Sequence, residues 1–379
     1  MTTSATLGGT GALVVMQRIE LGTGTYISAS GAAILALDSP VQGRGASNTP
    51  HIAFGHKGSF DTNLYRQTGS RLRTDDSLWV SGTMSGSALT VYGSVTMSGT
   101  VFNTLPLGTV EGRLTLTSGT PVTTSDVTAA TTIYFTPYKG DRIYLYDGTR
   151  WKLYSFSELS LALGTLTNAL PYDVFIYDNA GTLTLESLAW TNGTTRATAL
   201  TTLNGVLVKS GATTRRYLGT FYTTATTTTE DSAARRLLWN YYNQVMRPLM
   251  VLEPTDSWTY ATGAYRQMNG STANKVALVT GVNGQMIRVE VSALVSGAGT
   301  TYVAIGEDSI TTPEANSMPM QMTPSSSNNK NGLAVMMNVP AAGYHYYAAL
   351  EWGASGVTFY GDGGVPERVL SGIRGWIWG

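Results

Sequence analysis

Residues 344–360 read YHYYAALEWGASGVTFY, and the spacing of their apolar and aromatic side chains is typical of β-strands. Successive side chains on a strand point to opposite faces of the sheet. Tyr344 and Tyr346 therefore share one face, and Tyr347 lies on the other. The stretch predicts a sheet that turns about half of its aromatic side chains into a core.

The same kind of pattern continues through residues 254–379 and predicts a separate all-β unit. The chain ends in GIRGWIWG, and because a dangling tail is seldom so apolar, we expect a buried closing strand there. Two packed sheets would bury such strands, so we predict a C-terminal β-sandwich that is jelly-roll-like. The other expected strands are Val276–Thr280, Met286–Val295, Thr301–Ile305, Leu333–Val339, Tyr344–Trp352 and Val357–Tyr360.

Aromatic side chains of this unit are candidates for receptor binding. Aromatic faces stack on sugars and provide rigid contact surface. The alternative is that these residues only pack in the core. The candidate residues are Tyr344, Tyr346, Trp352 and Tyr360.

Residues 103–253 predict a middle β module carrying one helix. Turn signals separate pairs of alternating runs, as expected for hairpins. They are Asp147–Gly148, Asn179–Ala180–Gly181 and Ser210–Gly211. Thr228 followed by Asp231 is similar to a capping box, and apolar residues then recur at helical spacing up to Pro248. We therefore expect a helix over residues 229–248.

Residues 58–102 contain a second alternating stretch, LTVYGSVTMSGTVF at 89–102. One strand cannot bury its apolar face alone, and glycine recurs on that face every sixth residue. Where three chains wind about one axis, their backbones approach at intervals so closely that only glycine fits. The pattern therefore favours the intertwined β neck of a homotrimer. Monomeric hairpins with glycine at their turns are the alternative. The expected trimer-axis residues are Leu89, Val91, Gly93, Val95, Met97, Gly99 and Val101.

Composition narrows the classes of function. Lys and Arg number 24, Asp and Glu number 24, and only 13% of residues are charged, which argues against a nucleic-acid partner. There is no cysteine, hence no disulfide framework and no cysteine–zinc site. No stretch approaches the roughly 20 apolar residues of a membrane span, and no signal peptide is recognisable. Residues 1–57 are rich in small residues and are expected to attach the chain to other proteins, or else to form a floppy terminus.

Catalytic, cofactor and metal sites are not expected. The candidate carboxylate pairs are adjacent in sequence, and adjacent residues of a strand point to opposite faces. These pairs are Asp75–Asp76, Glu230–Asp231 and Glu307–Asp308. No nucleophile triad, phosphate loop or dinucleotide fingerprint is present. His51 and His56 could form a metal-binding ring on a threefold axis, but ordinary surface or packing roles are favoured.

Two long segments resemble bacteriophage proteins. FDTNLYRQTGSRLRTDDSLWVSGTMSGSALTVYGSV, residues 60–95, resembles a segment of tail-fibre and other virion structural proteins of tailed bacteriophages. A block that runs from ATTIYFTPYKGDRIYLYDGTRWKLYSFSELSLALGT through ATTRRYLGTFYTT to RRLLWNYYNQVMRPL looks like a module of phage tail-associated proteins. The resemblance covers about half of the chain, roughly 58–102 and 129–253. It implies a structural role in the virion and brings no catalytic motif with it.

These observations together predict an all-β, elongated, fibre-like homotrimer in a bacteriophage virion, assembled in the host cytoplasm. Residues 1–57 would bind other virion proteins, 58–102 would form the neck, 103–253 the middle module and 254–379 the head. The expected function is that of a tail or neck fibre that contributes to host attachment through a surface glycan or protein, without nucleic-acid or membrane partners. A capsid decoration protein or head fibre, and a polysaccharide-degrading tailspike, are the alternatives.

Overall fold

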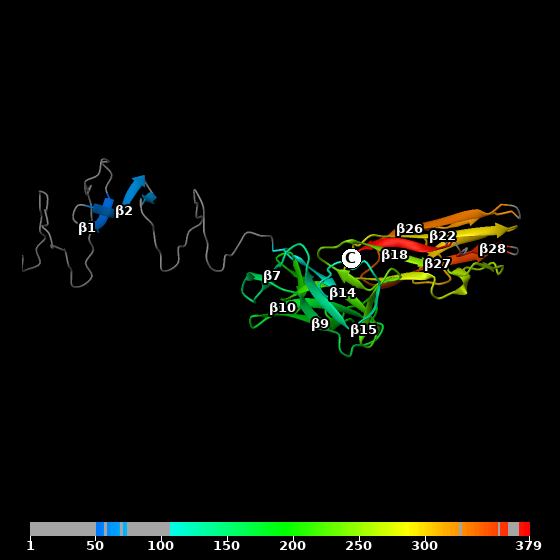
Figure 1. Cartoon of the computed structure of the whole chain (residues 1–379), viewed down its shortest axis with the longest axis horizontal. Coiled ribbons are helices and arrows are strands. Elements are labelled where there is room, and N and C mark those ends of the chain that lie inside the picture. Colours follow the sequence, from blue (N-terminus) through cyan, green and yellow to red (C-terminus); the bar gives the residue numbers. More distant parts are fainter. Residues whose placement is uncertain are drawn as a thin grey trace, which may run out of the picture. The chain divides into compact units, whose positions relative to one another are not determined.

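The computed structural model describes residues 51–56, 59–68, 71–73, 107–325, 328–354, 357–362 and 371–379, the first three ranges by their backbone alone. The chain divides into two compact units, Met1–Thr96 and Met97–Gly379. The described part of the first unit is an antiparallel sheet of three strands in the order β1–β2–β3 (Figure 1). They are β1 His51–His56, β2 Ser59–Thr68 and β3 Arg71–Arg73.

Several expectations fall outside the described residues. The segment 1–50 is one of them, and so are all the residues placed on the trimer axis. Those residues are Leu89, Val91, Gly93, Val95, Met97, Gly99 and Val101. The intertwined neck therefore stays a prediction.

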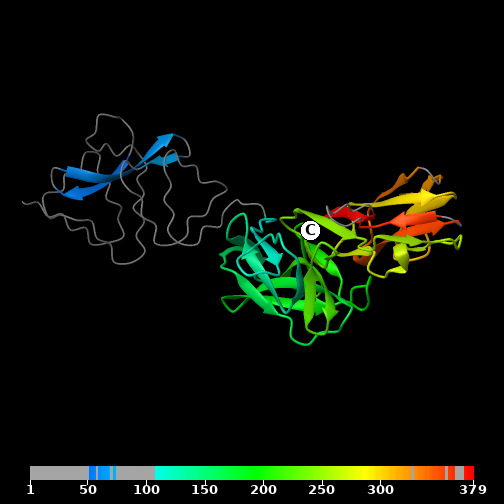
Figure 2. The same cartoon turned by 45° about the vertical axis from the view of Figure 1, so that its right-hand side comes forward.

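Residues 107–240 form the first half of the second unit, which we call the β14 half after its longest strand (Figure 2). Strand β14 (Ala212–Ala225) pairs with β10 along one edge, and with β13, β15 and β17 elsewhere. Apolar side chains from these strands and from smaller sheets meet in one core that includes Ile133, Phe135, Val174, Leu218 and Phe221. The remaining strands are β4 Gly112–Thr115, β5 Val127–Ala130, β6 Thr132–Pro137, β7 Arg142–Tyr146, β8 Trp151–Ser155, β9 Leu159–Ala162, β10 Pro171–Asn179, β11 Thr182–Ala189, β12 Leu200–Leu203, β13 Val206–Lys209, β15 Thr228–Asp231, β16 Arg235–Arg236 and β17 Leu238–Asn240.

All three predicted hairpins are confirmed: β7 pairs with β8, β10 with β11, and β13 with β14. In the first, the Asp147 carboxylate accepts hydrogen bonds from the backbone N–H groups of Thr149 and Arg150, both at 2.8 Å, which closes a four-residue loop. In the second, Ala180 and Gly181 have φ of 51° and 93°, and these positive values match a type I′ turn.

The prediction of a helix over residues 229–248 is wrong. The chain there forms β15, β16, β17 and the start of β18, which spans Met246–Leu252. Adjacent side chains of this segment pack in different cores. Leu238 packs in the core of the β14 half, and Trp239 packs in a second core. An extended backbone can supply both directions from adjacent residues, whereas a helix would have turned its apolar stripe to one side.

Residues 246–379 form the second half of the unit, and their strand order is that of a jelly roll. One sheet has the order β18–β29–β22–β26 and the other has the order β21–β27–β23–β25. Consecutive members of this set mostly alternate between the two sheets. The strands are β19 Ser257–Thr259, β20 Arg266–Gln267, β21 Lys275–Thr280, β22 Ile287–Gly297, β23 Thr301–Glu307, β24 Ser317–Met318, β25 Met320–Met322, β26 Lys330–Asn338, β27 Gly343–Gly353, β28 Val357–Tyr360 and β29 Gly372–Trp378.

Every strand predicted for the C-terminal region is therefore present, including the closing strand, to within a few residues at the ends. The described residues are all-β in class, with one short 3₁₀ turn, η1 (Met268–Gly270), and no α-helix.

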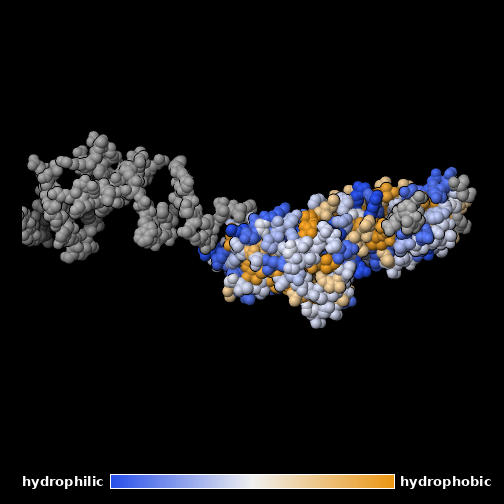
Figure 3. All heavy atoms as spheres, viewed as in Figure 1, coloured by the Kyte–Doolittle hydropathy of each residue, from blue (hydrophilic) through white to orange (hydrophobic). Residues whose placement is uncertain are grey.

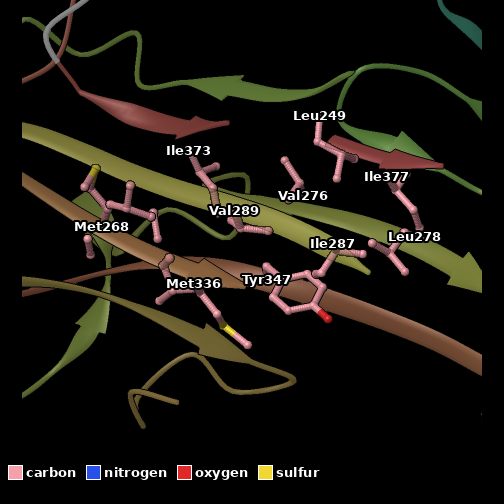
Figure 4. Close-up of a cluster of buried hydrophobic side chains, with 14 of the residues drawn as sticks. Leu249, Met268, Val276, Leu278, Ile287, Val289, Met336, Tyr347, Ile373 and Ile377 are labelled. Atoms are coloured by element: carbon pink, nitrogen blue, oxygen red, sulfur yellow. The ribbon is translucent and has the colours of Figure 1, made fainter. Parts of the chain in front are cut away.

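The jelly-roll core lies between its two sheets (Figure 4). Val289 of β22 and Ile373 of β29 meet Val276 of β21 there, and Tyr347 of β27 is fully buried, as its position on the strand predicts. The same cluster includes Phe175, Tyr217 and Trp239 of the β14 half. Because the two halves share this cluster, they pack as one body.

Candidate binding face

The candidate binding face is the outer side of β27. Tyr344, Tyr346 and Trp352 share it, since they are alternate residues of one strand and Tyr347 between them points into the core. Each of the three is partly exposed. The fourth candidate, Tyr360, lies on β28, which belongs to the other sheet, so the structure brings three of the four candidates together.

At one end of the face, Trp352 belongs to a row of aromatic rings. The ring of Tyr302 meets Trp352 edge-on with 5.1 Å between centroids, and Tyr265 lies 6.4 Å beyond Tyr302. Under this row, Ala348 and Leu350 are buried in a small apolar cluster that Tyr265 helps to cover. This end of the face is therefore packed against strand β23 and against the loop that carries Tyr265.

At the other end, Tyr344 forms one wall of a cleft of about 450 Å³ between the jelly roll and the β14 half. Its ring stacks on Tyr222 of β14, with the centroids 4.2 Å apart and the planes 20° apart. Strands from both halves supply the lining, which consists of Asn168, Ala169, Tyr222, Thr223, Thr224, Ala234, Arg235, Leu237, Val251, Thr272, Ala273, Lys275, Ala277 and Tyr344.

The cleft is basic. Arg235 and Lys275 line it, and none of the lining residues is Asp or Glu. The Lys275 ammonium lies 4.7 Å from the centre of the Tyr346 ring, which makes the tyrosine a neighbour of the cleft. Sequence reasoning missed both cations, because Arg235 was assigned to a helix and Lys275 immediately precedes the predicted strand.

The two stacked tyrosines keep their hydroxyl protons at neutral pH. Burial, reinforced by the neighbouring Tyr222, raises the pKa of Tyr344 to about 12, although Arg235 acts in the opposite direction. Burial also raises the pKa of Tyr222. Each hydroxyl can therefore both donate and accept a hydrogen bond.

Behind the face, a polar cluster ties β27 to the turn after β23. The His345 Nδ1 atom lies 2.8 Å from Asp308 Oδ2, and Asp308 Oδ1 accepts a 3.0 Å hydrogen bond from the backbone N–H of Tyr346. Tyr347 donates its hydroxyl proton to Glu307 Oε1 at 2.9 Å. The cluster thus fixes the segment that carries Tyr344 and Tyr346.

Alternation did not predict this cluster, because Asp308 stands outside the strand. Strand β23 ends at Glu307, and Asp308 has a φ of 50°, so its carboxylate turns back toward His345 instead of to the opposite face. Glu307 Oε1 lies 3.9 Å from the same His345 nitrogen. The two adjacent carboxylates thus converge on one ring, although the expectation was that they would point apart.

The other carboxylate pairs have structural partners or are not described. Asp231 forms ion pairs with Arg236 at 3.0 Å and Arg247 at 2.8 Å, and Glu230 pairs with Arg235 at 3.3 Å. Asp75 and Asp76 lie outside the described residues.

Within the described ranges, no group of three or more His, Cys, Asp or Glu side chains is placed to hold a metal ion. The side chains of His51 and His56, which begin and end β1, are not among those described. In the same part of the chain, no helix is long and apolar enough to cross a membrane.

Comparisons with known proteins identify no family for this chain. No family model matches the chain, and no curated protein matches it. Among solved structures, the insecticidal delta-endotoxin Cry8Ea1 from Bacillus thuringiensis aligns with 71% of this chain and 52% of its own, at 7% identity and a TM-score of 0.21. The chain spans about half of that protein, and a likeness this weak carries no argument.

Proposed function

We propose that this protein is a structural component of a bacteriophage virion, a homotrimeric tail or neck fibre that contributes to host attachment. The resemblance of two long segments to phage structural proteins motivates the proposal. The jelly roll supports it by analogy, because this architecture is common among viral capsid and lectin domains. Residues 1–57 would join the fibre to other virion proteins.

The observation that carries the assembly part is the outer face of the β18–β29–β22–β26 sheet. Met246, Met337 and Trp378 are 59%, 51% and 42% exposed on strands of this sheet. Met250, Leu252, Met318 and Leu333 are also exposed there. Figure 3 shows several hydrophobic groups of atoms on the surface of this half. Exposed apolar side chains gathered on one face are typical of an interaction site.

We assign this face to other copies of the same chain. The glycine-spaced stretch at 89–102 independently favours neighbouring chains over monomeric hairpins, because glycine recurs at a regular interval on its apolar face. In the middle of the face, Glu290 pairs with both Arg288 and Arg374, which leaves these three side chains with one excess positive charge. A partner therefore needs mainly apolar surface, which the exposed methionines of another copy offer.

Light scattering coupled to gel filtration of the full chain tests the assembly. The proposal expects a mass near three chains, and a monomer would contradict it. Antibodies against the chain test the location, since they should label intact particles in electron micrographs. Failure to find the chain in purified particles would overturn the virion assignment, and the position of the label separates a tail or neck fibre from a capsid decoration protein.

Binding is favoured over polysaccharide cleavage in the cleft. Cleavage of glycosidic bonds generally uses a pair of carboxylates about 5 to 10 Å apart. The lining residues of the cleft include neither Asp nor Glu. The cations and tyrosines that do line it are suited to holding a ligand.

A further inference from the structure

We propose that the cleft between Tyr222 and Lys275 binds a carboxylated sugar, the acidic unit of a surface polysaccharide or glycan. The inference rests on the proposed role in attachment and names the ligand class for it. The cleft volume of about 450 Å³ lies within the roughly 300–1,000 Å³ that small-molecule sites have. It therefore has room for one or two sugar units.

The charge of the cleft selects an anion. Arg235 donates from Nη1 to Glu230 at 3.3 Å, and its side chain is 54% exposed, so the guanidinium retains further N–H donors. Among the described residues, no carboxylate forms an ion pair with Lys275. Because Glu230 already balances Arg235, the charge of Lys275 is the one that favours a negatively charged ligand. The remaining N–H donors of the Arg235 guanidinium match a carboxylate with parallel hydrogen bonds.

The remaining lining selects a sugar rather than a bare anion. Asn168 and Thr272 bring an amide and a hydroxyl to the cleft, and the protonated hydroxyls of Tyr222 and Tyr344 add groups that can donate or accept. Aromatic side chains present an apolar body beside a polar tip, the combination that suits the ring and hydroxyls of a sugar. An inorganic anion would leave these uncharged groups without a role.

The walls are rigid, which lowers the cost of binding. Tyr222 belongs to β14, and Tyr344 and Lys275 belong to paired strands, with Val279 of β21 opposite Tyr344. The stacked rings of Tyr222 and Tyr344 join the two halves of the unit at one wall of the cleft. The Asp308 cluster behind β27 fixes the backbone of Tyr346, whose ring lies beneath Lys275.

Titration calorimetry on the full chain tests the proposal with two acidic probes, tetragalacturonate and 3′-sialyllactose. The methyl ester of tetragalacturonate and plain lactose are their uncharged controls. We expect at least one acid to bind at least tenfold more tightly than its control. Binding of neither acid, or equal binding of acid and control, would overturn the proposal. Equal competition by inorganic phosphate would reduce the cleft to a simple anion site and overturn the sugar assignment.

Matched variants locate the binding. Lys275→Met and Arg235→Met remove a charge but keep an apolar stem, and each should weaken acid binding at least tenfold. Lys139→Met removes an exposed lysine that does not line the cleft and should leave binding unchanged. Undiminished binding by both cleft variants would contradict the assignment. The mass of the same samples separates the two proposals: a trimer without acid binding leaves the fibre proposal standing, whereas a monomer that binds the acid refutes only the trimer.

Discussion

Both ring nitrogens of His345 face hydrogen-bond acceptors. Nδ1 lies 2.8 Å from the Asp308 carboxylate, and Nε2 lies 3.0 Å from the Ala341 carbonyl. Only the cationic ring can donate from both nitrogens. Burial acts to lower the pKa of His345, but the hydrogen bond and charge of Asp308, with smaller contributions from Ala341 and Glu307, outweigh it and raise the pKa above its usual value.

This geometry predicts a pH dependence of stability. A group whose pKa is raised on folding stabilises the protein fully below its unfolded pKa, about 6.5 for histidine, and this contribution is lost as pH rises through the folded value. Burial also raises the pKa of the neighbouring Glu307 carboxyl. Its contribution to stability is likewise lost as pH rises, but over a lower pH range. We expect the difference in melting temperature between the wild type and His345→Gln to shrink as pH rises from 6. Scanning calorimetry at several pH values measures it, and a constant difference would contradict the cationic ring.

A second residue-scale prediction concerns the buried pair of Asp173 and Arg196. Asp173 is only 1% exposed, and Arg196 meets its carboxylate from Nε at 2.7 Å and from Nη2 at 3.1 Å. Arg196 also donates to the Gly281 carbonyl at the end of β21, so it links the β14 half to the jelly roll. Removing one partner of a buried pair leaves an unpaired charge and costs about 3–5 kcal/mol. We expect Arg196→Met to lower the free energy of unfolding in urea by that amount.

The double variant Arg196→Met/Asp173→Leu is the control for this prediction. It removes both charges, so it should be more stable than Arg196→Met alone. Thr220 also donates to Asp173 at 2.7 Å and loses its acceptor in the double variant, which limits the recovery. A double variant that is less stable than the single one would show that the charge of Asp173 is not the source of the loss.

Among the structural elements, the turn between β10 and β11 offers a stabilising change. Ala180 and Gly181 connect the paired residues Asn179 and Thr182, and both have positive φ. Asparagine adopts this conformation more readily than alanine, and Asn-Gly is the favoured pair for a type I′ turn. We expect Ala180→Asn to raise the free energy of unfolding by about 0.5–1 kcal/mol, a part of the penalty for alanine in the left-handed region. Gly181→Ala should lower it by about 1 kcal/mol, although open space surrounds that position. Urea denaturation of both variants tests the turn, and equal effects of the same sign would contradict it.

The elements that sequence could predict are those specified by neighbouring residues. Alternation and turn residues predicted the hairpins and the C-terminal strands, because both depend on a few adjacent side chains. The helix over 229–248 failed because Leu238 and Trp239 enter different cores, which only the tertiary structure reveals. Tyr344, Tyr346 and Trp352 share one face because they lie at alternate positions of one strand, which the sequence shows. The positions of Tyr360 and of the two cations of the cleft are set by the pairing of strands that are distant in sequence, which the sequence does not show.

At the scale of the whole second unit, the two sheets of the jelly roll present different outer surfaces. One carries exposed methionines and Trp378, and the other carries the tyrosines beside the basic cleft. This division suits a protein that assembles through one sheet and binds a ligand through the other. The cleft needs both halves of the unit, since Tyr222 and Lys275 come from different halves.

The outer face of the β18–β29–β22–β26 sheet, which we propose as the surface of assembly, gives the last prediction. Pro248, Trp376, Arg288 and Met337 lie in one row across the four strands, so a charge at Met337 falls within the face. We expect Met337→Glu to convert the proposed trimer to smaller species. A charged side chain would have to be buried at the interface, and Arg288 beside it already pairs with Glu290. Ile310→Glu is the matched control, since Ile310 is 44% exposed in the loop after β23 and lies outside this sheet. Light scattering over a range of concentrations measures both, and a Met337→Glu protein that keeps the mass of the wild type would exclude this face from the interface.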